Sequence, residues 1–191
     1  MKYLGSFIAS LLLLAPTFGG ESQGPAPSRA SLSRLLEVLH FVRAYQEMAA
    51  VSERVFKERN QGTDAEFARF MGVVARADLS DMNDCVLNLV ERRGRFGQAE
   101  VDELVAIFES PLGKKVLAET NRVMRATIEQ QIVVKPSFDS FSPQDLQRIR
   151  EIYQTAVFQK YGAMVSSKEW ANGMMQCVLA SKDVRAANLK L

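Results

Sequence analysis

Apolar residues recur every three or four positions along most of the chain, which is the spacing of one face of an α-helix. Such stripes run through residues 31–59, 67–74, 82–94, 98–109, 111–135, 142–164 and 170–178. The only β-branched run, Gln131 to Lys135, ends one of these stripes, and no strong strand pattern is found. The sequence therefore predicts an all-α fold of about six or seven amphipathic helices, packed as helical hairpins in a single domain.

Capping residues and helix breakers mark where these helices begin and end. The first pattern is long, and a break is expected near His40 to Arg43, although no glycine or proline marks the place. The pattern ends at Asn60-Gln61-Gly62, where glycine suits a left-handed cap. Ser110-Pro111 and Ser142-Pro143 are good helix starts, because serine caps a free N–H and proline fits the first helical position. We therefore expect two helices to meet at an angle at Ser110-Pro111.

The corner at Ser110-Pro111 also carries a family resemblance. Phe108, Ser110, Pro111, Gly113 and Lys115 fit a Phe/Tyr-x-Ser-Pro-x-Gly-x-Lys core that follows an acidic helix start. Over roughly 25 residues the chain resembles the domain-of-unknown-function 2059 family of small exported bacterial helical proteins. The resemblance implies an all-α fold. It implies no established activity, so no catalytic residue can be assigned from it.

The same corner contains a conflict of charge. Lys114 and Lys115 lie in the first turn of the helix that Pro111 begins, where free N–H groups favour anions and disfavour cations. A bound carboxylate or phosphate would relieve the conflict, and so would a neighbouring acidic side chain. The sequence thus offers Ser110 to Lys115 as an anion-binding corner, with two lysines that point into water as the simpler alternative.

Two stretches of the chain echo one another. Glu100 to Lys115 aligns without gaps with Asp145 to Lys160, and both begin with an acid. The alignment also pairs Ile107 with Ile152, Phe108 with Tyr153, Ser110 with Thr155, and Lys115 with Lys160. Such agreement could come from a decayed duplication or from the general similarity of amphipathic helices, and the sequence leaves both open.

The chain begins with the pattern of a secretory signal peptide. Lys2 precedes an apolar core that reaches Ala15 and is too short to span a bilayer, and Thr17-Phe18-Gly19 supplies small residues for cleavage. We expect residues 1–19 to be a signal peptide, 20–31 a flexible linker and 32–191 the helical domain. The protein is then exported, periplasmic or secreted, with no transmembrane helix after cleavage. An uncleaved anchor is the alternative.

Charge and cysteines narrow the class of protein. The 191-residue chain is 47% hydrophobic, which excludes a disordered chain, and its net charge of +2 provides no overall field to recruit nucleic acid. Its two cysteines, Cys85 and Cys177, suggest one disulfide in an exported protein, with two unpaired core thiols as the alternative. A disulfide between them would stabilise the fold by about 4 kcal/mol in the chain-entropy model.

Few residues point to a catalytic or metal site. His40 is the only histidine, so a Ser-His-Asp enzyme would have to use it, and an ordinary zinc site is not expected. The acids near Asp78 could bind calcium, and Glu100 with Glu103 could serve a hydrolase, but both patterns are typical of helix starts and solvated helix faces. Methionines at helical spacing usually fill core gaps rather than bind copper. We therefore predict no cofactor and no metal.

One helix end is crowded by arginines. Arg92, Arg93 and Arg95 could hold an anionic envelope component such as a phospholipid, or they could form an ordinary solvated helix end. The sequence as a whole predicts an exported, non-enzymatic protein that binds another envelope protein or component, and it is compatible with a homo-oligomer. A small envelope hydrolase and a helical carrier of an apolar ligand are the alternatives, the latter because the chain has 11 Phe and 8 Met.

Overall fold

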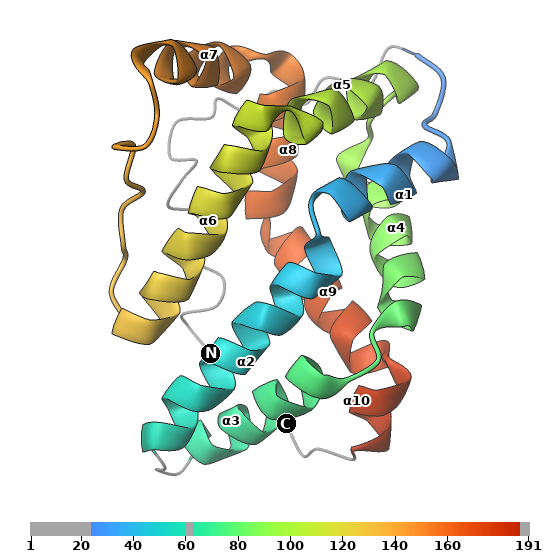
Figure 1. The fold of residues 1–191 in the computed structure, drawn as a ribbon. Helices are drawn as coiled ribbons and strands as arrows, with labels where there is room; N and C mark the ends of the chain where they lie inside the picture. The colour runs from blue at the N-terminus through green and yellow to red at the C-terminus, as the bar shows by residue number, and fades with distance from the viewer. Residues whose placement is uncertain (1–23, 60–62, 188–191) are drawn as a thin grey trace.

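The computed structural model describes residues 24–59 and 63–187, and every regular element in these two ranges is an α-helix. The helices pack into a single body around one apolar core (Figure 1). Their bounds are α1 (Arg29–Val38), α2 (Phe41–Arg59), α3 (Thr63–Arg76), α4 (Ser80–Gly94), α5 (Gln98–Glu109), α6 (Pro111–Gln130), α7 (Pro143–Gln154), α8 (Ala156–Ser166), α9 (Lys168–Ala180) and α10 (Lys182–Ala186). The all-α prediction is confirmed.

The described residues form ten helices, more than the six or seven expected. Two predicted helices are broken, and the short α10 is added at the end of the described chain. The first break is at His40, whose φ of 47° lies in the left-handed region between α1 and α2, so the expected break near this position is confirmed. The second is at Thr155, which ends α7 and caps α8 by accepting a hydrogen bond from the Phe158 N–H at 3.3 Å.

α1 begins earlier than the predicted linker allows. Ser28 caps this helix by accepting a hydrogen bond from the Ser31 N–H at 3.1 Å. The residues before it lie against the start of α5, where the Gln98 side chain accepts the Ser28 N–H at 2.6 Å and the Gln98 backbone donates to the Pro25 carbonyl at 2.9 Å. The expectation of a flexible linker up to residue 31 is therefore wrong for its last part, because side-chain capping starts the helix at Arg29.

Three expectations fall outside the residues that the structure describes. They are the signal peptide at 1–19, the beginning of the linker at 20–23 and the turn at Asn60-Gln61-Gly62. Among the described residues, no helix is both long enough and apolar enough to cross a membrane.

Packing brings helices that are distant in sequence to the α5–α6 corner. α3 packs along α2, and α4 packs along α9. α1 and α8 both contact α5, while α6 leaves the corner and runs beside α2 (Figure 1). α7 and α8 reach the same end of the molecule as the corner, at the top of Figure 1. The corner is therefore surrounded by protein on several sides rather than projecting into solvent.

The core is built from the apolar stripes that the sequence predicted. Val86, Val101, Leu104 and Val178 are fully buried and come from α4, α5 and α9. Burying an aliphatic side chain of this size stabilises the fold by about 1.5–3 kcal/mol. α5 thus contributes two of these fully buried residues to the core that it shares with α4 and α9.

Candidate functional site at the α5–α6 corner

α5 begins with a partly buried ion pair. The Glu100 carboxylate accepts hydrogen bonds from the Gly97 N–H at 2.7 Å and from Lys160 Nζ at 2.8 Å. Lys160 belongs to α8 and also lies over the Phe96 ring, 5.2 Å from its centroid. Burial by itself would raise the pKa of Glu100, but the Lys160 and Gly97 hydrogen bonds outweigh it and the pKa is lowered. The acidic first turn that the sequence noted is therefore a docking contact for α8.

Ser110 ends α5 and begins α6. Its hydroxyl donates to the Ile107 carbonyl at 2.6 Å and accepts from the Gly113 N–H at 2.9 Å. Its own carbonyl accepts the Lys114 N–H at 2.9 Å, and Pro111 follows as the first residue of α6. One residue thus satisfies backbone groups of both helices, and the predicted two-helix corner is present.

Gly113 lets the first turn of α6 lie directly on the end of α5. A Cβ atom at this position would be 2.0 Å from the Ile107 carbonyl oxygen and 2.7 Å from Phe108 Cα. Both atoms belong to the backbone and cannot rotate away as a side chain could. The glycine in the Ser-Pro-x-Gly pattern is therefore explained by a close approach between two helices, which the sequence alone does not reveal.

Lys115 has an acidic partner inside the protein. Its Nζ donates to Asp145 Oδ2 at 3.2 Å and to the Ser140 carbonyl at 3.0 Å, and it lies 5.2 Å from the centroid of the Phe141 ring. The pKa of Asp145 is lowered first by the hydrogen bond from the Ser142 N–H and then by Lys115. A lysine in the first turn of α6 needs either a bound anion or a neighbouring acid, and Lys115 has the neighbouring acid. Lys114 is exposed, and binding of an external anion at this corner stays a prediction.

A small apolar cavity lies beside the corner. Its volume is about 20 Å³, which is about the space that one water molecule needs. Phe108 and Gly113 of the first corner line it together with Ile152, Tyr153 and Phe158 of α7 and α8. Phe108 is 3% exposed, and its ring centroid lies 6.0 Å from that of Phe158. The aromatic residue of the family pattern is therefore a core residue at the junction of four helices.

A second, open hollow lies on the surface of α2. Ala50, Glu53, Arg54, Lys57 and Glu58 line it, so it is mostly charged. The Glu53 carboxylate is bound to Arg76 at 2.7 Å and to Lys57 at 3.0 Å. These hydrogen bonds, led by the one from Arg76, lower the pKa of Glu53. A carboxylate held in this way is fixed as an anion and is a poor proton donor.

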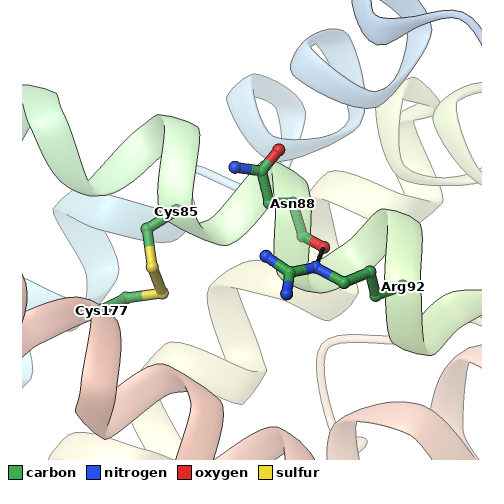
Figure 2. The surroundings of a disulfide bond; sticks show 4 residues. All are labelled: Cys85, Asn88, Arg92 and Cys177. Carbon is green, nitrogen blue, oxygen red and sulfur yellow. Dashed lines mark hydrogen bonds between the residues drawn. A yellow bond between two sulfur atoms is a disulfide. The ribbon is translucent and has the colours of Figure 1, made fainter.

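The three arginines at the end of α4 are exposed, as a solvated helix end would be. Arg92 folds back along its own helix and donates from Nε to the Asn88 carbonyl at 3.2 Å (Figure 2). Arg95 has a φ of 49° and ends the helix in the left-handed conformation. Gly94 is the last residue of α4, where the predicted stripe over residues 82–94 also ends, and it is buried against Phe96. In the described part of the chain, no acidic partner is found for Arg92, Arg93 or Arg95, and anion binding there stays a prediction.

Cys85 of α4 and Cys177 of α9 lie at disulfide distance, with their sulfur atoms 2.02 Å apart and their Cα atoms 5.6 Å apart (Figure 2). The bond would join two helices that already pack along each other. Such a pair is typical of proteins in an oxidising compartment.

The acidic residues near the start of α4 serve as helix caps. Asp81 Oδ2 accepts the Lys182 N–H at the start of α10 at 2.9 Å. In return, Asp183 Oδ2 accepts the Asp78 N–H just before α4 at 2.7 Å. Asp78 also accepts the Ser80 N–H, which is the main reason that its pKa is lowered. These hydrogen bonds account for Asp78 and Asp81, whereas Asp84 is bound to Arg29 of α1 at 2.8 Å. The sequence missed the partner of Asp81 because α10 itself was not predicted.

Residues 94–132 match the model of a bacterial family described as an uncharacterized protein conserved in bacteria, the domain-of-unknown-function 2059 family. The matched segment holds α5, the corner and α6, about a fifth of the chain. The resemblance expected from the sequence is confirmed over this segment, and the description assigns no activity. No curated protein and no solved structure matches the chain.

Proposed function

We propose that this chain, which resembles an uncharacterized bacterial family over α5 and α6, is an exported interaction protein that binds another protein of the cell envelope. The observation that carries this proposal is an exposed apolar loop between α6 and α7. Ile132 and Val133 are 61% and 66% exposed, and Phe138 is 45% exposed. Large apolar side chains gathered on one exposed segment are typical of surfaces that bind other proteins.

The backbone of this loop is also available for binding. Among the described residues, the N–H groups of Val133 and Lys135 have no hydrogen-bond partner, whereas the Val134 N–H donates to the Thr127 hydroxyl at 3.1 Å. The run Gln131 to Lys135 is β-branched, and no helix covers it. A segment with free backbone donors can pair with a strand of a partner, so that main-chain bonds add affinity and the apolar side chains add specificity.

The loop is held in position by the rest of the molecule. The Ser137 N–H donates to Glu119 Oε1 of α6 at 2.6 Å, and the Ser140 carbonyl accepts Lys115 Nζ at 3.0 Å. Because these bonds order the loop before any partner arrives, binding costs less conformational entropy. Anchored ends with apolar side chains exposed between them favour an interaction role for the loop.

Site-specific photocrosslinking in cells tests the interaction. A photoreactive amino acid at Val133 or Phe138 should give one discrete adduct, whereas the exposed Ala163 of α8 should not. The double variant Ile132→Asp with Val133→Asp should lose the Phe138 adduct while keeping the melting temperature, because both side chains are already exposed. Equal adducts from Ala163, or no adduct from either loop position, would overturn the proposal.

Export has its own test. The N-terminal pattern and the pair Cys85–Cys177 both support it. The mature protein should lack residues 1–19, and its mass should rise by that of two hydrogen atoms after reduction of the disulfide. Persistence of Met1 in a fully processed export fraction, or free thiols before reduction, would contradict it.

Neither alternative gains a specific observation in the described residues. A carrier would need an internal space larger than the cavity of about 20 Å³ at the corner. A hydrolase would need two facing carboxylates with room for a substrate, and the Glu53 carboxylate in the α2 hollow is committed to Arg76 and Lys57. The apolar loop favours the interaction role over both.

A further inference from the structure

We propose that α7 and α8 are a second, diverged copy of the unit formed by α5 and α6, and that the two copies are each other's docking partner. The first unit is defined as residues 96–130 and the second as residues 141–166. This inference is independent of the partner proposed for the apolar loop.

The two units share their helix boundaries. Adding 45 to the bounds of α5, Gln98–Glu109, gives the bounds of α7, Pro143–Gln154, and adding 45 to the first residue of α6 gives the first residue of α8. The same shift pairs Glu100 with Asp145, Phe108 with Tyr153 and Lys115 with Lys160 without a gap. The second helices of the units differ in length, because α6 continues to Gln130 whereas α8 ends at Ser166.

The two corners also share their hydrogen bonds. Ser110 donates to the Ile107 carbonyl at 2.6 Å, and Thr155 donates to the Ile152 carbonyl at 2.8 Å. Both hydroxyls also accept the N–H three residues further on. Ser167 forms the same pattern before α9, so these bonds alone would not identify a repeat. The contacts between the units are the stronger evidence.

Those contacts are reciprocal. Lys115 of the first unit binds Asp145 at the start of the second, and Lys160 of the second unit binds Glu100 at the start of the first. Each lysine also lies over the aromatic ring that precedes the other unit's first helix, and each Nζ-to-centroid distance is 5.2 Å. A contact that recurs with the two partners exchanged is the mark of a two-fold, self-complementary interface.

The centre of the interface follows the same symmetry. Ile107 and its counterpart Ile152 line the small cavity at the corner, as do Gly113 and its counterpart Phe158. The large ring of Phe158 and the glycine at position 113 thus stand at equivalent positions around one cavity of about 20 Å³. Two rings there would overfill the space, and two glycines would leave it empty. The volumes of the two units have therefore diverged in a complementary way.

Divergence also explains why the family match covers one unit. The matched segment ends at residue 132, before the second unit begins. The second unit has Ala156 where the first has Pro111, and Phe158 where the first has Gly113. Within this chain, Glu100 and Lys115 of the matched unit are bound by residues of α8 and α7.

Double-mutant cycles in urea unfolding test the reciprocal docking. The single variants are Lys160→Met, Glu100→Gln, Lys115→Met and Asp145→Asn, in which the amide oxygen can still cap its helix. The loss in urea midpoint of each cognate double variant should be smaller than the sum of its two single losses. The cognate pairs are Lys160→Met with Glu100→Gln and Lys115→Met with Asp145→Asn. The crossed combinations, Lys160→Met with Asp145→Asn and Lys115→Met with Glu100→Gln, should be additive.

Zero-length carbodiimide crosslinking of the unmodified protein gives a second measurement that no variant can compromise. Peptide mapping should find both the Lys115–Asp145 and the Lys160–Glu100 crosslinks within one chain. Lys57 with Glu53, one helical turn apart on α2 and 3.0 Å from each other, is the positive control. Additivity in either cognate cycle, or loss of one of the two crosslinks while the control forms, would overturn the two-copy docking.

Discussion

The two helix corners of this protein share a hydroxyl cap but differ in the third residue of the helix that follows it. At the first corner, Gly113 removes every side-chain atom, so that α6 can lie on the Ile107 carbonyl of α5. At the second, Phe158 occupies the equivalent turn position and contributes a ring to the core. The cap at Ser110 and Thr155 is therefore the shared feature. The close approach to the preceding helix is specific to the first corner, because Phe158 carries the Cβ atom for which the first corner has no room.

Removing the Phe158 ring should lower the stability of the fold more than any other change at the two corners. Phe158 is 7% exposed and packs near the rings of Phe108, Tyr153 and Tyr161. Phe158→Ala should cost about 3–5 kcal/mol of unfolding free energy, because the lost ring adds to the existing cavity. Chemical denaturation measures this loss, and a cost below about 1 kcal/mol would show that the units do not depend on the ring.

Adding a single methyl group at Gly113 should lower the unfolding free energy by a smaller amount. Gly113→Ala places Cβ against backbone atoms that cannot rotate away, so a loss of about 1–3 kcal/mol is expected. Gly173→Ala is the matched control, because the added Cβ there meets only the tip of the Leu89 side chain, which can shift. If both substitutions cost the same in urea unfolding, the close approach at the corner is not what requires glycine.

The pair Glu100–Lys160 should make stability depend on pH in the acid range. The pKa of Glu100 is lowered in the folded protein, so its contribution is complete above its ordinary pKa of 4.5 and is lost as the pH falls through the folded value. Glu100→Gln should cost about 1–2 kcal/mol at pH 7, allowing for partial exposure. The difference in stability between the wild-type protein and Glu100→Gln should shrink as the pH is lowered.

Urea midpoints at neutral and acid pH measure this gap. Glu103→Gln is the control, because Glu103 shares the exposed side of α5 and has no hydrogen-bond partner in the described part of the chain. A gap that stays constant from pH 7 to pH 3, or an equal response of Glu103→Gln, would contradict the assignment.

Giving the second corner the Ser-Pro sequence of the first should change the stability least, and should raise it. Thr155→Ser with Ala156→Pro installs Ser-Pro at the start of α8, where no internal hydrogen bond of the Ala156 N–H is found among the described residues. Restricting the unfolded chain in this way should stabilise by about 0.4–1 kcal/mol. Ala163→Pro, inside α8, should instead destabilise by about 3 kcal/mol. Similar losses for the two proline variants would mean that the corners are not equivalent.

The sequence predicted the features of this fold that depend on neighbouring residues. The apolar stripes, the Ser110-Pro111 corner and the Ser142-Pro143 helix start are all encoded within a few positions. The breaks were harder, because His40 adopts a positive φ without being glycine and Thr155 ends a helix without a proline. A non-glycine residue seldom adopts a positive φ, so nothing in the sequence assigns this role to His40. Thr155 is a good cap, but a threonine inside a continuous apolar stripe does not by itself mark a helix end.

The site was less accessible to sequence reasoning, because its contacts join distant residues. The need for glycine at position 113 appears only when the Ile107 carbonyl is placed beside it. Lys115 and Asp145 are 30 positions apart, and Lys160 and Glu100 are 60 apart. The internal alignment contained all four charged residues, but it compared them as equivalents and could not show that each lysine meets the other unit's acid.

The exchange of aspartate caps between α4 and α10 has a consequence for the order of folding. Asp78 and Asp183 are separated by 105 positions, Asp81 and Lys182 by 101, and Cys85 and Cys177 by 92. Contacts at such long range form late, because the intervening chain must first lose its freedom. The Asp78 N–H just before α4 and the Lys182 N–H at the start of α10 therefore reach their acceptors only when the last helices have arrived. A denatured chain with its disulfide intact has already closed most of this loop, and it should refold faster than the reduced chain.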